Sequence, residues 1–342
     1  MKHGSEALQQ SFCNDLACCL DNADAPREAQ EMHRHAIELA PRAGRPDEAA
    51  TACTNLATSL RNCGDMQGAM AQLLQARRHA LGYDEALGAT WHLDLATLAI
   101  LRDLGRFDEA LRAGELALLS LAQHPVALPV GHGHLACLWL HLGQGARARQ
   151  SLLAAQAVPV RVFLQARLAQ LQGRLAVALD RPARASFTQA QALAPQAGRT
   201  VLQSMIALDH ALVLPPEQAL AVPQEVVQRG ERLGYAGVAL AGRIRAARFA
   251  RLAGQTDQAR QWARAALDTP PDIEPDDLYR GELWLQAALA LRAGGAKAAA
   301  RDAADIGANW VRQRAQAQVP APFRDSFVHR NPVNRDLLAL AG

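Results

Sequence analysis

A helical hairpin that recurs along the chain most strongly limits how this sequence can fold. In residues 56–81, apolar side chains follow helical spacing on both sides of Gly64, with Leu56 and Leu60 before it and Leu73 after it. Gly64 predicts the end of the first helix, because glycine adopts the left-handed conformation beyond a helix C-terminus without steric cost. So short a turn predicts two antiparallel helices.

Copies of this hairpin are predicted over most of the chain. The turns at Gly64, Gly105 and Gly143 lie about 40 residues apart, a spacing typical of repeat arrays. A single hairpin cannot bury its own apolar face, so it requires similar hairpins stacked on either side. We therefore expect about eight hairpins over residues 1–311, with the least regular copies in residues 160–235.

The last residues, 312–342, are predicted to cap the array. Phe323 and Phe327 lie four residues apart, so they share a helix face. Asn331 followed by Pro332 predicts a helix start, with asparagine as the N-cap and proline at the first helical position. A terminal element that covers the last apolar groove is what a repeat array needs for solubility.

The composition favours an all-helical chain and limits the classes of partner. Hydrophobic residues make up 50% of the chain, mainly Ala and Leu, which form helices readily, whereas aromatic residues make up 4%. A net charge of +3 is too small to predict nucleic-acid binding. The six cysteines fall within predicted helices, so we expect reduced thiols. The N-terminus has no apolar signal segment and the apolar run 116–122 is too short to span a bilayer, so we expect a cytoplasmic protein without membrane segments.

The hairpins resemble tetratricopeptide repeats. The family's unit places small residues and Leu, Ala or aromatic residues at fixed positions of both helices, with a period of about 34 residues. The period here is longer, and most aromatic positions hold Leu or His. The resemblance implies an all-α, right-handed superhelical solenoid of tetratricopeptide-like hairpins that binds a protein or peptide. The matching positions are Leu16, Ala17, Leu20, Ala29, Ala36 and Pro41, then Leu56, Ala57, Leu60, Ala69, Leu73 and Ala76, then Leu135, Ala136, Trp139, Ala148, Leu152 and Ala155.

The long repeats and the tail at residues 323–335 are similar to the C-terminal sensor arm of large bacterial transcriptional regulators and signalling ATPases. In that family, an NTPase module and a DNA-binding module precede the arm. A phosphate-binding loop requires the pattern GxxxxGK[ST], which neither Lys2 nor Lys297 satisfies. The resemblance therefore implies a non-enzymatic sensor arm of a larger regulator. A free-standing adaptor or peptide receptor is the alternative.

In the repeats that this chain resembles, the first helix of each hairpin lines a concave groove. When the groove positions of that family are transferred to this sequence, they predict a groove rich in arginine. Arginine binds carboxylate or phosphate through two parallel hydrogen bonds, so an acidic peptide or an acidic segment of a partner protein is the expected ligand. The alternative is that these arginines are solvated and paired with Asp and Glu of adjacent helices. Direct nucleic-acid binding is not expected. The expected groove residues are Asn14, Cys18, Thr58, Arg61, Asn62, Arg102, Arg167, Arg174, Arg248, Arg251 and Arg292.

Two clusters have the composition of metal sites. The first contains His132, His134, Cys137 and His141, and the last three of these follow one helix face. Zinc accepts such ligands, but the sequence places no fourth ligand. A histidine-rich helix with a packed cysteine is the favoured interpretation. The acidic residues of the segment 268–277 lack the glycine and the final glutamate of a calcium loop, so we interpret them as a solvated acidic loop. We therefore expect no metal, no cofactor and no catalytic residues.

Overall fold

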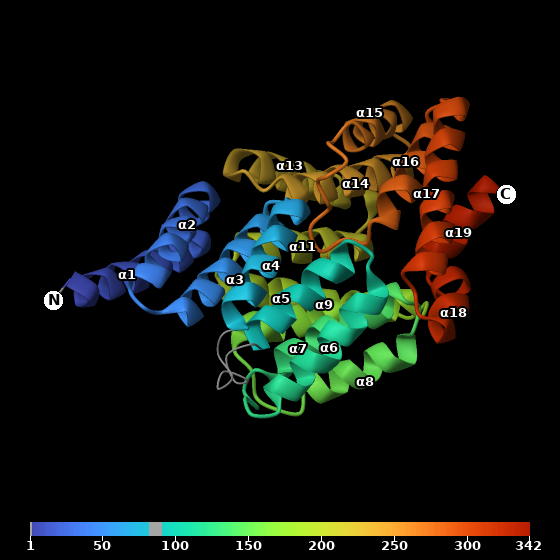
Figure 1. The fold of residues 1–342 in the computed structure, drawn as a ribbon. Helices are drawn as coiled ribbons and strands as arrows, with labels where there is room; N and C mark the ends of the chain where they lie inside the picture. Colours follow the sequence, from blue (N-terminus) through green and yellow to red (C-terminus); the bar gives the residue numbers. More distant parts are fainter. Residues whose placement is uncertain (1, 82–90) are drawn as a thin grey trace.

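The structure is a computed structural model that describes residues 2–81 and 91–342. These residues form helices, and no strand occurs within the described ranges (Figure 1). Helices adjacent in the chain pack against one another, as expected for a helical repeat. The predicted all-α fold is therefore confirmed. Within the described ranges, no helix is both long enough and apolar enough to cross a membrane.

Paired helices make up most of the chain. Each pair encloses a short turn, and the pairs follow one another from the N-terminus to residue 317. The last helices then return toward the middle of the array (Figure 1). The helices are α1 (Lys2–Asn22), α2 (Pro26–Arg42), α3 (Pro46–Asn62), α4 (Met66–Ala80), α5 (Trp91–Asp103), α6 (Phe107–Leu121), α7 (Leu128–His141), α8 (Gly145–Ala155), α9 (Val162–Ala178), α10 (Arg184–Leu193), α11 (Thr200–His210), α12 (Pro216–Ala219), α13 (Ala221–Leu233), α14 (Ala236–Leu252), α15 (Thr256–Leu267), α16 (Gly281–Ala293), α17 (Lys297–Ala317), α18 (Arg324–His329) and α19 (Pro332–Ala341).

The turns within the hairpins adopt the backbone conformation that the sequence predicts. Gly64, Gly105 and Gly143 have φ values of 90°, 70° and 69°, in the left-handed region. Asp24 and Asp180 occupy the equivalent turns of other hairpins with φ values of 60° and 53°. Aspartate tolerates this region better than most residues, so the same turn forms without glycine.

The segment between α15 and α16 crosses the interior of the molecule. We call residues 268–280 the crossing loop. Ile273 pairs with Asp65 in an isolated β-bridge at the α3–α4 turn. The backbone amide of Asp276 donates to the carbonyl of Gly237, at the start of α14, over 3.1 Å. The loop thereby connects the second hairpin with α14.

The interpretation of this segment as a solvated acidic loop is wrong for its second half. Asp268 and Asp272 are exposed, as expected of solvated residues. Asp276 and Asp277 are buried, because the backbone contacts of the loop carry them into the centre of the array. The acidic loop is therefore partly an internal structural element.

The C-terminal segment packs against the middle of the array. Phe327 is fully buried, and its ring lies 5.3 Å from that of Phe107 at the start of α6. Ser326 Oγ donates to the carbonyl of Leu142 over 2.8 Å, beside the turn at Gly143. A Cβ atom on Gly143 would lie 2.3 Å from the Ser326 carbonyl oxygen, so this close approach requires glycine.

The expected boundary between residues 311 and 312 falls inside α17, which runs to Ala317. Phe327 and Leu337 from the last helices share one core cluster with Leu98 and Trp284 from the repeats. The segment 312–342 therefore completes a core formed by the repeats.

Asn331 is the N-cap of α19, as the sequence predicts. Its Oδ1 accepts hydrogen bonds from the backbone amides of Val333 and Asn334, over 3.0 and 3.2 Å. Its Nδ2 donates to the carbonyl of His141 over 2.8 Å, which links α19 to the end of α7.

We expect Asn331→Ala to lower the free energy of unfolding by about 1–2 kcal/mol, because one side chain provides both the cap and this link. Urea denaturation of the purified chain measures the change. Asn309→Ala is the matched control, because Asn309 is an exposed residue of α17. Its expected change is within about 0.5 kcal/mol. Equal midpoints for the two variants would contradict the assigned role of Asn331.

Candidate functional site

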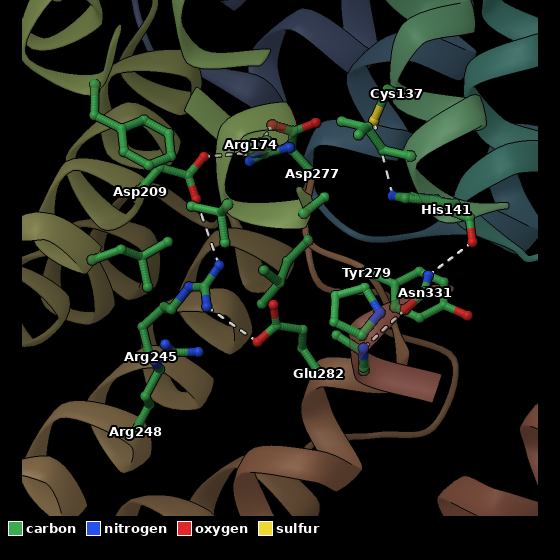
Figure 2. A pocket seen from close by; sticks show the side chains of 18 residues that line it. Cys137, His141, Arg174, Asp209, Arg245, Arg248, Asp277, Tyr279, Glu282 and Asn331 are labelled. Carbon is green, nitrogen blue, oxygen red and sulfur yellow. Dashed lines mark hydrogen bonds and ion pairs between the residues drawn. The ribbon is translucent and has the colours of Figure 1, made fainter. Parts of the chain in front are cut away.

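Two pockets lie in the centre of the molecule, one on each side of the crossing loop. The Arg248 pocket has a volume of about 210 Å³ and is lined by residues of α7, α9, α10, α11, α14, α16 and α19 and of the crossing loop (Figure 2). The Arg61 pocket has a volume of about 200 Å³ and is lined by residues of α3, α7, α9 and α11. Asp277 of the crossing loop lines both pockets. This side chain is therefore the element that the two pockets share.

Asp277 is held by two arginines of α9. Arg167 donates two hydrogen bonds to its carboxylate, and Arg174 Nη2 lies 2.9 Å from Oδ2. Burial alone would raise the pKa of Asp277, but Arg167 and Arg174 hold the pKa well below its usual range. The carboxylate is therefore charged at neutral pH. Two arginines on one helix face thus bind one acidic side chain of a distant loop.

A chain of ion pairs continues from Arg174 into the Arg248 pocket. Arg174 Nε lies 2.6 Å from Asp209 Oδ2 on α11. The other oxygen of Asp209 lies 3.5 Å from Arg245 Nη2 on α14. Arg245 Nη1 lies 3.1 Å from Glu282 Oε2 on α16. Figure 2 shows these side chains alternating in charge along one wall of the pocket.

A second group of charges lies at the Arg61 pocket and behind it. Asp103 pairs with Arg61 and with Arg102, each over 2.6 Å. Burial would raise the pKa of Asp103, but the two arginines lower it. Arg102 is 1% exposed, and its Nη1 has no hydrogen-bond partner among the described residues.

Asp276 differs from the other carboxylates of the site. Its Oδ1 is buried and has no hydrogen-bond partner among the residues that the structure describes. Burial raises its pKa to about 7, although Arg61 opposes the shift. Asp276 is therefore a group whose charge changes near neutral pH.

The charges of the site do not cancel. The site has seven arginines, but it has five carboxylates and the Cys137 thiol, whose pKa Arg102 and His141 lower to about 6. The excess is one positive charge when Cys137 and Asp276 are both ionised, and two when Asp276 is protonated. The arginines are Arg61, Arg102, Arg167, Arg174, Arg199, Arg245 and Arg248, and the carboxylates are Asp103, Asp209, Asp276, Asp277 and Glu282.

Three of the histidine and cysteine residues of α7 divide between the two pockets. Cys137 and His141 line the Arg248 pocket, with Sγ 3.9 Å from Nε2, whereas His134 lines the Arg61 pocket. Burial opposes ionisation of Cys137, but Arg102 and His141 lower its pKa to about 6. Burial lowers the pKa of His134 to about 3, so its ring is neutral. In residues 2–81 and 91–342, no three His, Cys, Asp or Glu side chains converge in a way that could hold a metal ion.

The structure brings most of the expected groove residues together. Thr58, Arg61, Asn62 and Arg167 line the Arg61 pocket, and Arg174 and Arg248 line the Arg248 pocket.

The remaining expected residues lie elsewhere. Arg102 is buried beside Asp103. Asn14 and Cys18 accept hydrogen bonds from Asn55 at the N-terminal end of the array, over 3.1 and 3.7 Å. Arg251 and Arg292 lie outside both linings, and Arg292 is exposed.

Sequence reasoning missed the acidic half of the site and Arg245. Arg245 lies three residues before Arg248 on α14, so helical spacing could have identified it. The acidic residues come from other elements, and only the fold brings them to the arginines. The site therefore agrees in part with both interpretations of the sequence. Most of its arginines pair with carboxylates, but one positive charge remains in excess.

No protein-family model and no curated protein matches this chain.

Proposed function

We propose that this chain is a superhelical, tetratricopeptide-like scaffold whose central groove binds an acidic segment of a partner protein. The observation that carries the proposal is the pair of ion pairs that Arg167 and Arg174 form with Asp277. The crossing loop is a peptide segment of this chain that lies in the groove, and its carboxylate is bound by two arginines. A partner segment with a carboxylate at the same place would make the same contacts.

The excess positive charge supports this proposal. A groove whose arginines outnumber its carboxylates attracts acidic segments and repels basic ones. Asp276 strengthens this preference when it is protonated, because the excess then rises by one charge. An acidic segment that displaces the end of the crossing loop would therefore meet a cationic groove.

A peptide with the sequence of residues 268–280 tests this recognition directly. The receptor is the Asp277→Asn chain, in which the loop's own carboxylate no longer competes for Arg167 and Arg174. The peptide is expected to bind at least about tenfold more tightly than the same peptide with Asp277→Asn, because a charge-assisted hydrogen bond contributes roughly 1.5–3 kcal/mol. Fluorescence anisotropy with labelled peptides measures both affinities.

The matched control changes an arginine outside the groove. Arg292→Gln in the receptor should leave peptide affinity within about twofold, because this side chain is exposed and lines neither pocket. Binding should also weaken as salt rises. Equal affinity for the two peptides would overturn the proposed recognition of a carboxylate by the groove.

We further propose that this binding serves bacterial regulation, as in the sensor arm of a transcriptional regulator. The support is the similarity of residues 323–335 to the end of such arms. Immunoblotting of source cells with an antibody against this region distinguishes two cases. A band well above 36.7 kDa supports the arm of a larger regulator, and a band at 36.7 kDa supports a free-standing adaptor.

A further inference from the structure

The Arg248 pocket contains cationic groups that the ion pairs of the groove leave unsatisfied. Arg248 lines the pocket, and no described residue forms an ion pair or hydrogen bond with it. Arg245 beside it is 4% exposed, and its buried Nε has no hydrogen-bond partner among the described residues. Two adjacent guanidinium groups in one pocket thus have unused donors (Figure 2).

The local charge explains why these donors favour an anion. Arg245 and Arg248 lie three residues apart on α14, so they share a helix face, and both line the pocket. Arg245 already engages Asp209 and Glu282 of the pocket wall. Burial and the neighbouring Arg245 lower the pKa of Arg248, whereas Glu282 raises it, and no described residue forms an ion pair with its guanidinium group. A bound anion would form the ion pair that Arg248 lacks.

Apolar side chains also line the pocket. Leu140, Val177, Phe187 and Leu212 contribute to its lining together with the ion-paired residues. Ligand pockets of this kind combine an apolar body with a few polar groups that orient the ligand. The volume of about 210 Å³ suits a small molecule and is too small for a folded segment.

We propose that the Arg248 pocket binds a small amphipathic monocarboxylate, with its head group on Arg248 and Arg245 Nε and its alkyl or aryl body on the apolar side chains. A single negative charge matches the one arginine of this pocket, Arg248, that forms no ion pair with a described residue. A dianion would carry a second charge toward Glu282, which also lines the pocket. This inference goes beyond the proposed function, because it concerns another ligand and another pair of arginines.

Isothermal titration of the full chain with butanoate, hexanoate and octanoate tests the proposal, with hexan-1-ol as the uncharged counterpart. At least one acid is expected to bind with one molecule per chain and to saturate at roughly millimolar concentration. Hexan-1-ol is expected to bind at least about tenfold more weakly than hexanoate, since it cannot form a charge-assisted hydrogen bond with the arginines. Absence of binding by all three acids, or equal binding of the alcohol, would overturn the proposal.

Variants on α14 locate the site. Arg248→Gln is expected to weaken binding of the acid about tenfold, because the amide keeps most of the side-chain volume and loses the charge. Arg251→Gln is the matched control on the same helix, and it should change the affinity less than about twofold because Arg251 does not line the pocket. Both variants are compared by thermal unfolding to establish that they are folded.

Two further outcomes decide the assignment. Equal affinity of Arg248→Gln and the unchanged chain would place the acid elsewhere. A larger loss in Arg251→Gln than in Arg248→Gln would also contradict the assigned pocket. The acidic peptide that tests the proposed function contacts Arg167 and Arg174, so its failure to bind would leave the monocarboxylate site intact.

Discussion

The variant Asp277→Asn is expected to lose about 3–5 kcal/mol of unfolding free energy, because removing one partner of a buried ion pair leaves the other charges without compensation. Asp277 is 8% exposed, and it is the shared partner of Arg167 and Arg174. Asparagine keeps the size of the side chain and tolerates the left-handed conformation that Asp277 adopts, with φ of 51°. The expected loss therefore comes from the charge rather than from the backbone.

Urea denaturation at neutral pH measures this loss as a lower midpoint at an unchanged slope. Asp272→Asn is the matched control, because Asp272 belongs to the same loop but is exposed. Its expected change is within about 0.5 kcal/mol. Similar midpoints for the two variants would mean that Asp277 does not anchor the loop.

Amide hydrogen exchange gives a second, local measurement of the same variant. The amide of Asp276 is hydrogen bonded to the Gly237 carbonyl, so it should be protected while the crossing loop is held in place. Asp277→Asn is expected to speed exchange at this amide more than in the middle of α14. Uniform acceleration throughout the chain would indicate global destabilisation instead of release of the loop.

The local features of the fold were predictable because their signals lie within a few residues. Gly64, Gly105 and Gly143 mark turns, since the left-handed conformation that ends these helices favours glycine. Asn331 and Pro332 mark the start of α19 for an equally local reason. Propensity and capping were therefore sufficient for the helices of the hairpins.

The long-range features were not predictable in this way. No local signal indicates that residues 268–280 cross the interior, because their Pro and Asp content is also typical of a surface loop. No local signal indicates the contact between Phe327 and Phe107 either. Both contacts depend on how the hairpins stack, which is a property of the whole array.

In the candidate site, too, some residues could be predicted from the sequence and others could not. The arginines were predicted from the groove positions that the resemblance to tetratricopeptide repeats implies. The carboxylates that bind them could not be predicted, because Arg167 and Asp277 are 110 residues apart in sequence. The pairing of charges is therefore decided by tertiary structure, which places Asp277 of the crossing loop between Arg167 and Arg174.

The titration of Asp276 leads to an expected pH dependence of stability. Burial raises the pKa of Asp276 from 3.8 to about 7 in the folded chain, and the unfolded chain has the ordinary value. Arg61 and Arg167 oppose this shift, whereas Asp277 and Asp103 add to it. Between these two pKa values the folded state binds more protons than the unfolded state. The contribution of Asp276 to stability should therefore be largest near pH 4 and fall as the pH rises to about 7.

Asp276→Asn is expected to remove this contribution, because the amide stays neutral like the protonated acid. At pH 8 the variant should be more stable than the unchanged chain by roughly 4 kcal/mol, and the difference should shrink toward zero near pH 4. Urea denaturation across this range measures it. Burial raises the pKa of Glu274 to about 7 as well, so part of the slope should persist in the variant. Asp268→Asn is the exposed control, and an equal gain in that variant, or no gain in Asp276→Asn, would contradict the buried titration.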